Sequence, residues 1–181
     1  MTSQLLSAYL LHGKGGRPTG TVLRLEECLK PLLPHLVFHR PALLHSDPNV
    51  LAERSFADLQ TKDITRNSIV VGISLGGLLA AKLQELGRED LTVICISSPA
   101  WADDVKLERR MSGRAAFYSS SDVVIAGRTA QWLELADAYD TTWLSHDTDA
   151  HKRSVALLIA AWLSGDKAVI QRLRVNESRE H

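Results

Sequence analysis

The run SIVVGISLGG, at positions 68–77, constrains the fold most strongly, because it joins a strand pattern to a helix pattern through a short glycine-rich turn. The apolar stretch at 69–71 is typical of a strand buried on both faces. After the turn, leucines recur at helical spacing until Gly87 supplies a stop. A buried strand that leads directly into a helix indicates a parallel sheet with helical crossovers.

The rest of the chain alternates strand and helix patterns without repeats, which predicts one α/β domain over residues 1–175 and a polar tail, residues 176–181, that we expect to fray. The architecture expected is a three-layer sandwich with a mostly or wholly parallel sheet of about six strands. Strands are predicted at Leu5–Leu11, Leu36–His39, Ser68–Ile73, Leu91–Ser97, Arg114–Ser119 and Thr141–His146. Helices are predicted at Val22–Leu32, Asn49–Gln60, Leu75–Leu86, Val124–Ala136, His151–Leu163 and Val169–Leu173. Pro31 is expected to bend or end the first of them.

Composition narrows the classes of partner. The 181 residues include 21 basic and 21 acidic side chains, so no net charge favours nucleic acid or an anionic membrane, and a small molecule is the expected partner. No stretch reaches the ~20 apolar residues of a membrane span, and no basic leader begins the chain, so a cytoplasmic protein is expected. Cys28 and Cys95 lack metal or disulfide spacing and are predicted to be reduced and inert. The oligomeric state stays open.

The turn Gly72-Ile73-Ser74-Leu75-Gly76 has the G-x-S-x-G pattern of a strained turn that exposes a serine hydroxyl. A serine is a poor nucleophile unless a base and oxyanion donors lie nearby. Ser74 is therefore a candidate nucleophile, and the N–H of Leu75, the next residue, is a candidate oxyanion donor. The alternative is a tight strand-to-helix turn in which the serine is incidental.

The loop HGKGG, at positions 12–16, directly follows the first predicted strand, at the edge where parallel sheets bind ligands. Its glycines allow the backbone to approach a ligand, so Gly13 is predicted to border the substrate. The loop is interpreted as the second source of oxyanion donors. A phosphate cradle is a rival interpretation, although the spacing of a P-loop is absent, and a plain flexible turn is another.

The histidine base and the carboxylate that would assist Ser74 are expected in the loops after the later predicted strands. Asp122 follows the fifth predicted strand and is the candidate for orienting a histidine, with a helix N-cap as its alternative role. His151 lies beyond the sixth predicted strand in a loop that we expect to reach Ser74. His146 is the competing histidine, but it is predicted at the strand end, where its side chain would face the core. The order Ser74, Asp122, His151 suits a catalytic triad.

The cluster His146, Asp147, Asp149 and His151 has an alternative interpretation as a metal site, since histidine and aspartate suit a divalent ion. Spacing within one loop is not specific, and N-capping explains the two aspartates equally well. We therefore predict no metal and no cofactor. His45 shows no partner pattern and is predicted to be a surface or satisfied structural residue.

On these motifs, HGKGG, GISLGG, SSSD and DAH in this order, the chain resembles the small single-domain serine hydrolases of the α/β-hydrolase superfamily. The resemblance implies that Ser74, Asp122 and His151 form the triad and that the backbone N–H groups of Lys14 and Leu75 form the oxyanion hole. It also implies the strand order 4-3-5-6-7-8 in the strand labels of that superfamily. The first two strands of the larger members are absent from the pattern.

The segment Pro99–Gly113, where larger relatives insert a lid, is short and charged, so the minimal fold without a cap domain is expected. Trp101 at its start is a candidate substrate-binding residue, or a packing residue. The resemblance implies hydrolysis of a carboxylic ester or thioester of a small molecule through an acyl-enzyme. Amidase and acyltransferase activities share this mechanism. A binding protein that retains the fold without catalysis is the competing hypothesis.

Overall fold

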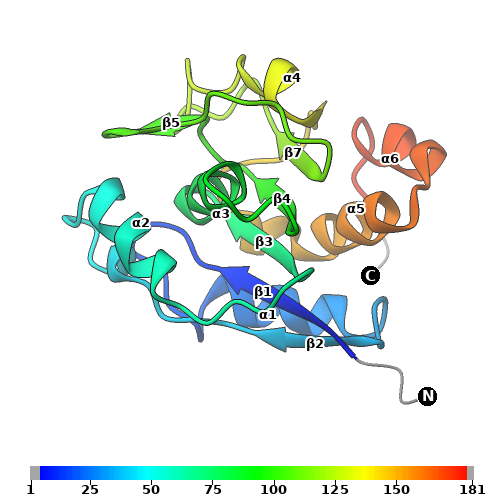
Figure 1. Cartoon of the computed structure of the whole chain (residues 1–181). Coiled ribbons are helices and arrows are strands. Elements are labelled where there is room, and N and C mark those ends of the chain that lie inside the picture. Colours follow the sequence, from blue (N-terminus) through cyan, green and yellow to red (C-terminus); the bar gives the residue numbers. More distant parts are fainter. Residues whose placement is uncertain (1–4, 179–181) are drawn as a thin grey trace.

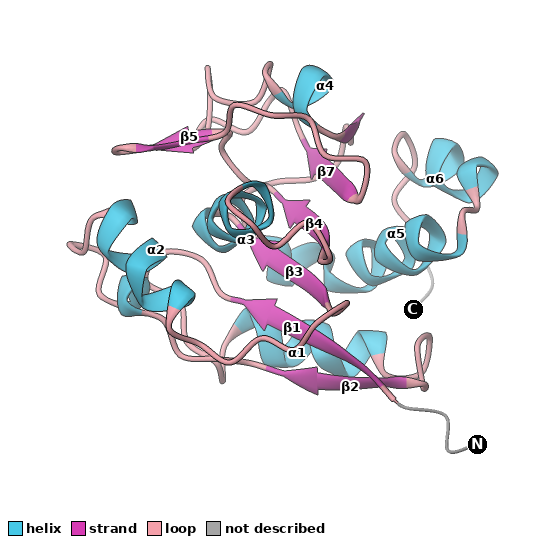
Figure 2. Cartoon of the chain, viewed as in Figure 1, coloured by secondary structure: helices cyan, strands magenta, loops and turns pink. Residues whose placement is uncertain are grey.

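Residues 5–178 are described by the computed structural model, in which a six-stranded sheet lies between two layers of helices (Figures 1 and 2). The strand order is β2-β1-β3-β4-β7-β8, and every pair of neighbours is parallel. The predicted sheet of about six parallel strands is therefore confirmed. The order also agrees with the one expected from the resemblance, because β2 and β1 take the first two places and β3 follows them.

The sheet strands are β1 (Leu6–Leu11), β2 (Leu36–His39), β3 (Ile69–Ile73), β4 (Thr92–Ile96), β7 (Arg114–Tyr118) and β8 (Asp137–Asp140). The α-helices are α1 (Thr21–Leu29), α2 (Ala52–Gln60), α3 (Leu75–Glu85), α4 (Trp132–Leu135), α5 (Lys152–Ser164) and α6 (Lys167–Leu173). Two 3₁₀ turns, η1 (Leu44–Ser46) and η2 (Thr148–His151), precede α2 and α5. The strands β5 (Trp101–Ala102) and β6 (Val105–Lys106) form a small antiparallel hairpin outside the sheet.

Alternating side chains of the strands feed two hydrophobic cores. In β1, Ala8 and Leu10 pack with α1, α5 and α6, whereas Tyr9 and Leu11 face the side covered by α2 and α3. This alternation is the period of two that places successive strand residues on opposite faces. Strand β3 lies at the centre and is buried along its whole length, which explains its continuous apolar sequence.

The segment between β4 and β7 contains the β5–β6 hairpin and no helix, in agreement with the expected absence of a cap domain. Within residues 5–178, no helix combines the length and the apolar composition needed to cross a membrane.

The helix predicted at Val124–Ala136 is wrong for most of its length. Residues 123–131 form turns, and only Trp132–Leu135 is helical. Val123 and Val124 are 85% and 55% exposed, so the apolar spacing does not reflect a buried helix face. Gly127 has a φ of +79°, a left-handed conformation that interrupts helical hydrogen bonding.

The strand predicted at Thr141–His146 is also wrong. The edge strand is β8, which ends at Asp140, and residues 141–146 turn back across the carboxyl ends of the strands. The polar sequence of β8 hides it from pattern analysis, because an edge strand tolerates charged side chains. Ala138 packs against the core on one face of the sheet and Tyr139 against the core on the other. The ring of Tyr139 stacks on Phe117 with centroids 5.1 Å apart.

Two residues in the described part of the predicted polar tail form hydrogen bonds to the start of α5. Glu177 accepts a hydrogen bond from His151 at 2.7 Å, and the carbonyl of Ser178 accepts one from Ser154. The remainder of the tail, residues 179–181, lies outside the described residues.

Candidate active site

Ser74 occupies a strained turn between β3 and α3. Its φ of 52° places a residue with a side chain in the left-handed region, where the turn geometry of the surrounding segment holds it. A Cβ on Gly76 would lie 2.6 Å from the carbonyl oxygens of Leu11 and His12, so only glycine fits where α3 begins beside β1. The predicted strand, turn and helix around Ser74 are thus confirmed.

His146 is the histidine that lies between Ser74 and Asp122. Its Nε2 is 3.0 Å from Ser74 Oγ, and its Nδ1 is 3.0 Å from Asp122 Oδ2. Because a carboxylate only accepts hydrogen bonds, Nδ1 carries the proton and Nε2 is free to accept from the serine hydroxyl. The side chain of Asp122 is 2% exposed and that of His146 is 28% exposed. The carboxylate is shielded from water while the imidazole faces the site.

The prediction that His151 reaches Ser74 is wrong. His151 caps α5, with its Nδ1 2.7 Å from Glu177 Oε1 and its Nε2 3.1 Å from Ser145 Oγ. The error follows from the misplaced strand: because β8 ends at Asp140, it is His146 that lies in a loop beyond the strand end. The polar residues of β8 gave no strand signal from which this end could have been predicted.

The turn that carries His146 is tied to the sheet. The Oγ of Ser97, which follows β4 with a φ of 49°, donates to the carbonyl of Ser145 at 3.1 Å. Leu144 is buried in the core beneath the turn. These two contacts anchor the residues next to His146 and thereby restrict the position of its imidazole ring.

Hydrogen bonds to nearby backbone groups fix the position of Asp122. Its Oδ1 accepts from the N–H of Val124, and its N–H donates to the carbonyl of Ser119. The predicted alternative, a capping role, is therefore present as a local turn contact, but no long helix follows. The second carboxylate oxygen is the one that accepts from His146.

Two buried histidines, His45 and His12, hold the 12–16 loop in place through hydrogen bonds to backbone groups. His45 Nε2 donates to the carbonyl of His12 at 2.7 Å, and its Nδ1 accepts from the hydroxyl of Ser55. His12 Nε2 accepts from the N–H of Leu43, so its Nδ1 donates to the carbonyl of Gly13. The carbonyl of His45 also accepts from the N–H of Gly15 at 2.8 Å. His45 is thus the satisfied structural residue predicted, although no pattern revealed its link to the loop.

Burial keeps both of these rings neutral. Removal from water lowers the pKa of His45 to about 4, with the His12 carbonyl opposing the shift and repulsion from His12 adding to it. Burial likewise lowers the pKa of His12. Each ring uses one nitrogen as donor and the other as acceptor, an arrangement that protonation would disrupt.

The backbone of this loop faces the serine. Gly13 packs so closely that an added Cβ would lie 3.2 Å from the Cβ of Ser74. Among residues 5–178, the N–H groups of Lys14 and Leu75 have no hydrogen-bond acceptor. A pocket of about 180 Å³ opens here, lined by the 12–17 loop, the start of α1, Ile73, Ser74 and His146. Gly13 is among the lining residues, and its contact with a substrate stays a prediction.

Trp101 lies elsewhere. It is in the β5–β6 hairpin, is 40% exposed, and has the guanidinium of Arg128 over its ring at 5.4 Å. It does not line the pocket at Ser74.

The four side chains considered as metal ligands point to different partners. His146 and His151 are engaged as described above. Asp149 binds Arg24 at 2.5 Å, which lowers the pKa of its carboxyl group, and Asp147 caps the η2 turn. In the described part of the chain, no three histidine, cysteine or acidic side chains are grouped to hold a metal ion. The arrangement gives no support to the metal interpretation of this loop.

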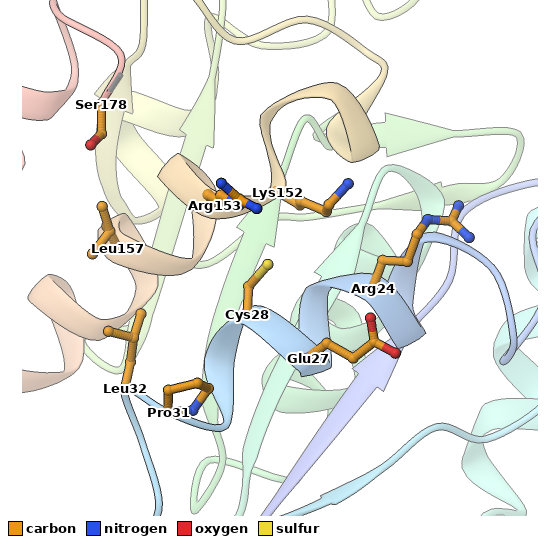
Figure 3. Close-up of a pocket in the computed structure, with 9 residues that line it drawn as sticks. All are labelled: Arg24, Glu27, Cys28, Pro31, Leu32, Lys152, Arg153, Leu157 and Ser178. Carbon is orange, nitrogen blue, oxygen red and sulfur yellow. The ribbon is translucent and has the colours of Figure 1, made fainter. Parts of the chain in front are cut away.

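A larger pocket, of about 490 Å³, lies between α1 and α5 and contains Cys28 rather than Ser74 (Figure 3). Figure 3 shows Arg24, Lys152 and Arg153 around this thiol. Burial raises the pKa of Cys28 in spite of the nearby cations, so the thiol is not activated as a nucleophile. Burial also raises the pKa of Cys95 to about 12. The larger pocket therefore contains no activated thiol among its lining residues.

The chain is similar in structure to several α/β hydrolases. Alpha/beta hydrolase domain-containing protein 10 from mouse has a TM-score of 0.70 and 12% identity, with 91% of this chain and 92% of that chain covered. Est1E from Butyrivibrio proteoclasticus has a TM-score of 0.63 and 11% identity, with 90% of each chain covered. An extracellular α/β-hydrolase from a Paenibacillus species has a TM-score of 0.61 and 11% identity, with 85% of this chain and 97% of that chain covered.

No protein-family model and no curated protein sequence matches the chain. The similarity is therefore one of architecture, and it confirms the predicted α/β-hydrolase fold.

Proposed function

With an α/β-hydrolase fold as the premise, we propose that the chain is a serine hydrolase that cleaves a carboxylic ester or thioester of a small molecule through an acyl-enzyme. The proposal rests on one observation above all. An unbroken chain of hydrogen bonds runs from Asp122 through His146 to Ser74, with both contacts at 3.0 Å, and the serine sits on a strained turn. A non-catalytic relative would not need these three side chains to remain in contact.

In the first half of the reaction, Ser74 Oγ attacks the carbonyl carbon while His146 Nε2 takes the hydroxyl proton. Asp122 stabilises the resulting imidazolium through the bond to Nδ1. The tetrahedral intermediate collapses when His146 returns the proton to the leaving alcohol or thiol, which leaves Ser74 acylated. In the second half, His146 takes a proton from water, the resulting hydroxide attacks the acyl carbon, and Ser74 recovers its proton as the carboxylic acid departs.

The developing oxyanion needs donors that are already in place. The N–H groups of Lys14 and Leu75 fill this role in the proposal, since each is without an acceptor among the described residues. Lys14 lines the pocket, and Leu75 directly follows Ser74. Leu75 is the first residue of α3, so the positive end of that helix adds to the stabilisation.

The site suggests a small acyl or alcohol group. Its volume of about 180 Å³ is below the ~300–1,000 Å³ of ordinary ligand pockets. The short β5–β6 hairpin provides no cap that would enclose a long chain. Binding of substrate by Trp101 remains a prediction, and in this proposal it applies only to a substrate that extends beyond the pocket.

The proposal is tested by hydrolysis of 4-nitrophenyl acetate, followed together with the intact mass of the protein during turnover. The wild type should form an acetyl adduct, and Ser74→Ala should lower kcat by about 10⁴-fold or more without an adduct. Ser145→Ala is the matched control, because Ser145 also contacts a histidine. Turnover that persists undiminished in Ser74→Ala would rule the proposal out.

A further inference from the structure

The pocket beside Ser74 is lined by two cationic side chains and by no carboxylate. Lys14 and Arg17 both belong to the loop that follows β1, and both line the pocket together with Ser74 and His146. Asp122 does not line the pocket, and its carboxylate accepts hydrogen bonds from His146 and from the N–H of Val124. A substrate in the pocket therefore meets a positive electrostatic environment.

These two cations have no acidic partner. Within residues 5–178, neither Lys14 nor Arg17 forms a salt bridge, and both are exposed. Two arginines outside the pocket differ, because Arg24 pairs with Asp149 and Arg40 pairs with Glu26. The positive charge at the pocket is thus left without local compensation, and it remains available to a ligand.

The start of α1 adds to the same field. Thr21 and Val22 line the pocket, and the first turn of this nine-residue helix has neither a side-chain cap nor an acidic residue. A helix N-terminus carries about half a positive charge, so its contribution is secondary to that of the two side chains.

We propose that the site takes esters or thioesters in which the acyl or the leaving group carries a carboxylate or a similar anion. The inference rests on the proposed hydrolase function and specifies its substrate. The ester carbonyl lies at Ser74 while the anionic group lies toward Arg17 and the side chain of Lys14. The neutral composition of the whole chain conceals this local excess of positive charge.

The experiment compares charged and neutral esters of the same size. Mono-4-nitrophenyl succinate carries its carboxylate on the acyl group, and 4-nitrophenyl levulinate is its neutral counterpart. 4-Acetoxybenzoate carries the charge on the leaving group, and its methyl ester is neutral. For at least one pair we expect kcat/KM to favour the anionic ester roughly tenfold at low salt. The preferred pair reveals which side of the scissile bond faces the cations.

The salt dependence provides a second readout. Because Lys14 and Arg17 are exposed, their attraction for an anion should be screened strongly at about 0.5 M NaCl, so the preference should fall toward unity. Substitution provides a third. In Arg17→Gln the ratio of anionic to neutral kcat/KM should fall about threefold, and in the double variant with Lys14→Gln it should approach one.

Arg66→Gln is the matched control, since Arg66 is an exposed arginine before β3, at the opposite end of that strand from Ser74. Its ratio should equal that of the wild type. If active wild-type protein shows no preference in either pair, or if the preference survives in the double variant, the anionic specificity is wrong although the hydrolase function stands. If no ester is cleaved and Ser74 is never acylated, both proposals fail.

Discussion

Two hydrogen-bonded chains of serine, histidine and carboxylate occur in this molecule: Ser74, His146 and Asp122 in one, and Ser145, His151 and Glu177 in the other. Their distances hardly differ, since the contacts are 3.0 and 3.0 Å in the first and 3.1 and 2.7 Å in the second. Their surroundings differ in every respect that matters for an acyl transfer.

Ser74 lies on a strained turn at the start of a helix and faces a pocket with two candidate oxyanion donors. Ser145 lies in a segment without regular secondary structure and has no positive φ, and its histidine is the N-cap residue of α5. Glu177 is also more exposed than Asp122, with 35% of its side chain accessible. Contact distances alone therefore do not define a catalytic serine, because the backbone around it must expose the hydroxyl and stabilise the product of attack.

Substitution of the carboxylate is expected to give the largest difference in kcat between the two serine–histidine–carboxylate sets. Asp122→Asn should lower kcat for an ester by about 10³–10⁴-fold, because an amide no longer holds His146 in the tautomer that accepts from Ser74. Glu177→Gln should change kcat less than about threefold. Steady-state kinetics on both variants measure this difference. Equal losses of kcat would show that the two serine–histidine–carboxylate sets do not differ in function.

The turn at Ser74 should be intolerant of side chains, unlike the turn at Ser145. Gly76→Ala forces a Cβ to within 2.6 Å of two backbone carbonyls, so we expect a loss of about 3 kcal/mol in the free energy of unfolding. Gly113→Ala is the control, because its Cβ would meet the nearest atom at 3.4 Å. Urea denaturation measures both values. A Gly76→Ala protein as stable as Gly113→Ala would show that the close approach is not required.

His45, which supports the 12–16 loop beside Ser74, should make the free energy of unfolding depend on pH. The pKa of His45 is about 4 in the folded protein and near 6.5 in the unfolded chain, so the unfolded state binds more protons between these values. Stability is therefore fully present above pH 6.5 and falls by about 3 kcal/mol as the pH drops to 4. His45→Gln retains a donor for the His12 carbonyl and should flatten this part of the curve, measured as unfolding free energy against pH. If the pH dependence of the unfolding free energy is unchanged in His45→Gln, other titratable groups cause it.

The smallest effect on ester hydrolysis is expected for the thiol of Cys28, which lies in the larger pocket between α1 and α5 (Figure 3). Since burial raises the pKa of Cys28, we expect Cys28→Ser to leave ester hydrolysis within about twofold of the wild type. Initial rates at neutral pH are sufficient to measure this. A large loss would mean that the bigger pocket participates in the reaction.

The same contrast explains what sequence analysis predicted and what it missed. The turn at Ser74 is encoded locally, by an apolar strand and by glycines that fit only where backbones meet, so its position was predicted correctly. The position of Asp122 after β7 follows from the same alternation. The histidine was missed because β8 is a polar edge strand that ends at Asp140, and the pairing of β8 with β7 depends on contacts between distant segments.

The support of the 12–16 loop by His45 was also beyond prediction. His45 and the loop lie about 30 positions apart, and their link consists of hydrogen bonds to backbone groups, for which sequence carries no periodic signal. The local positive charge at the pocket was hidden for a similar reason, because the sum over the whole chain is zero.

The most direct test of the assignment of Ser74 and His146 is the rate of fluorophosphonate labelling, followed by intact mass and peptide mapping. One adduct on Ser74 is expected, absent in Ser74→Ala and slowed by about 10³-fold or more in His146→Gln. In His151→Gln the rate should remain within about threefold of the wild type. An adduct on Ser145, or labelling that depends on His151 and not on His146, would show that Ser74 and His146 are not the nucleophile and its base.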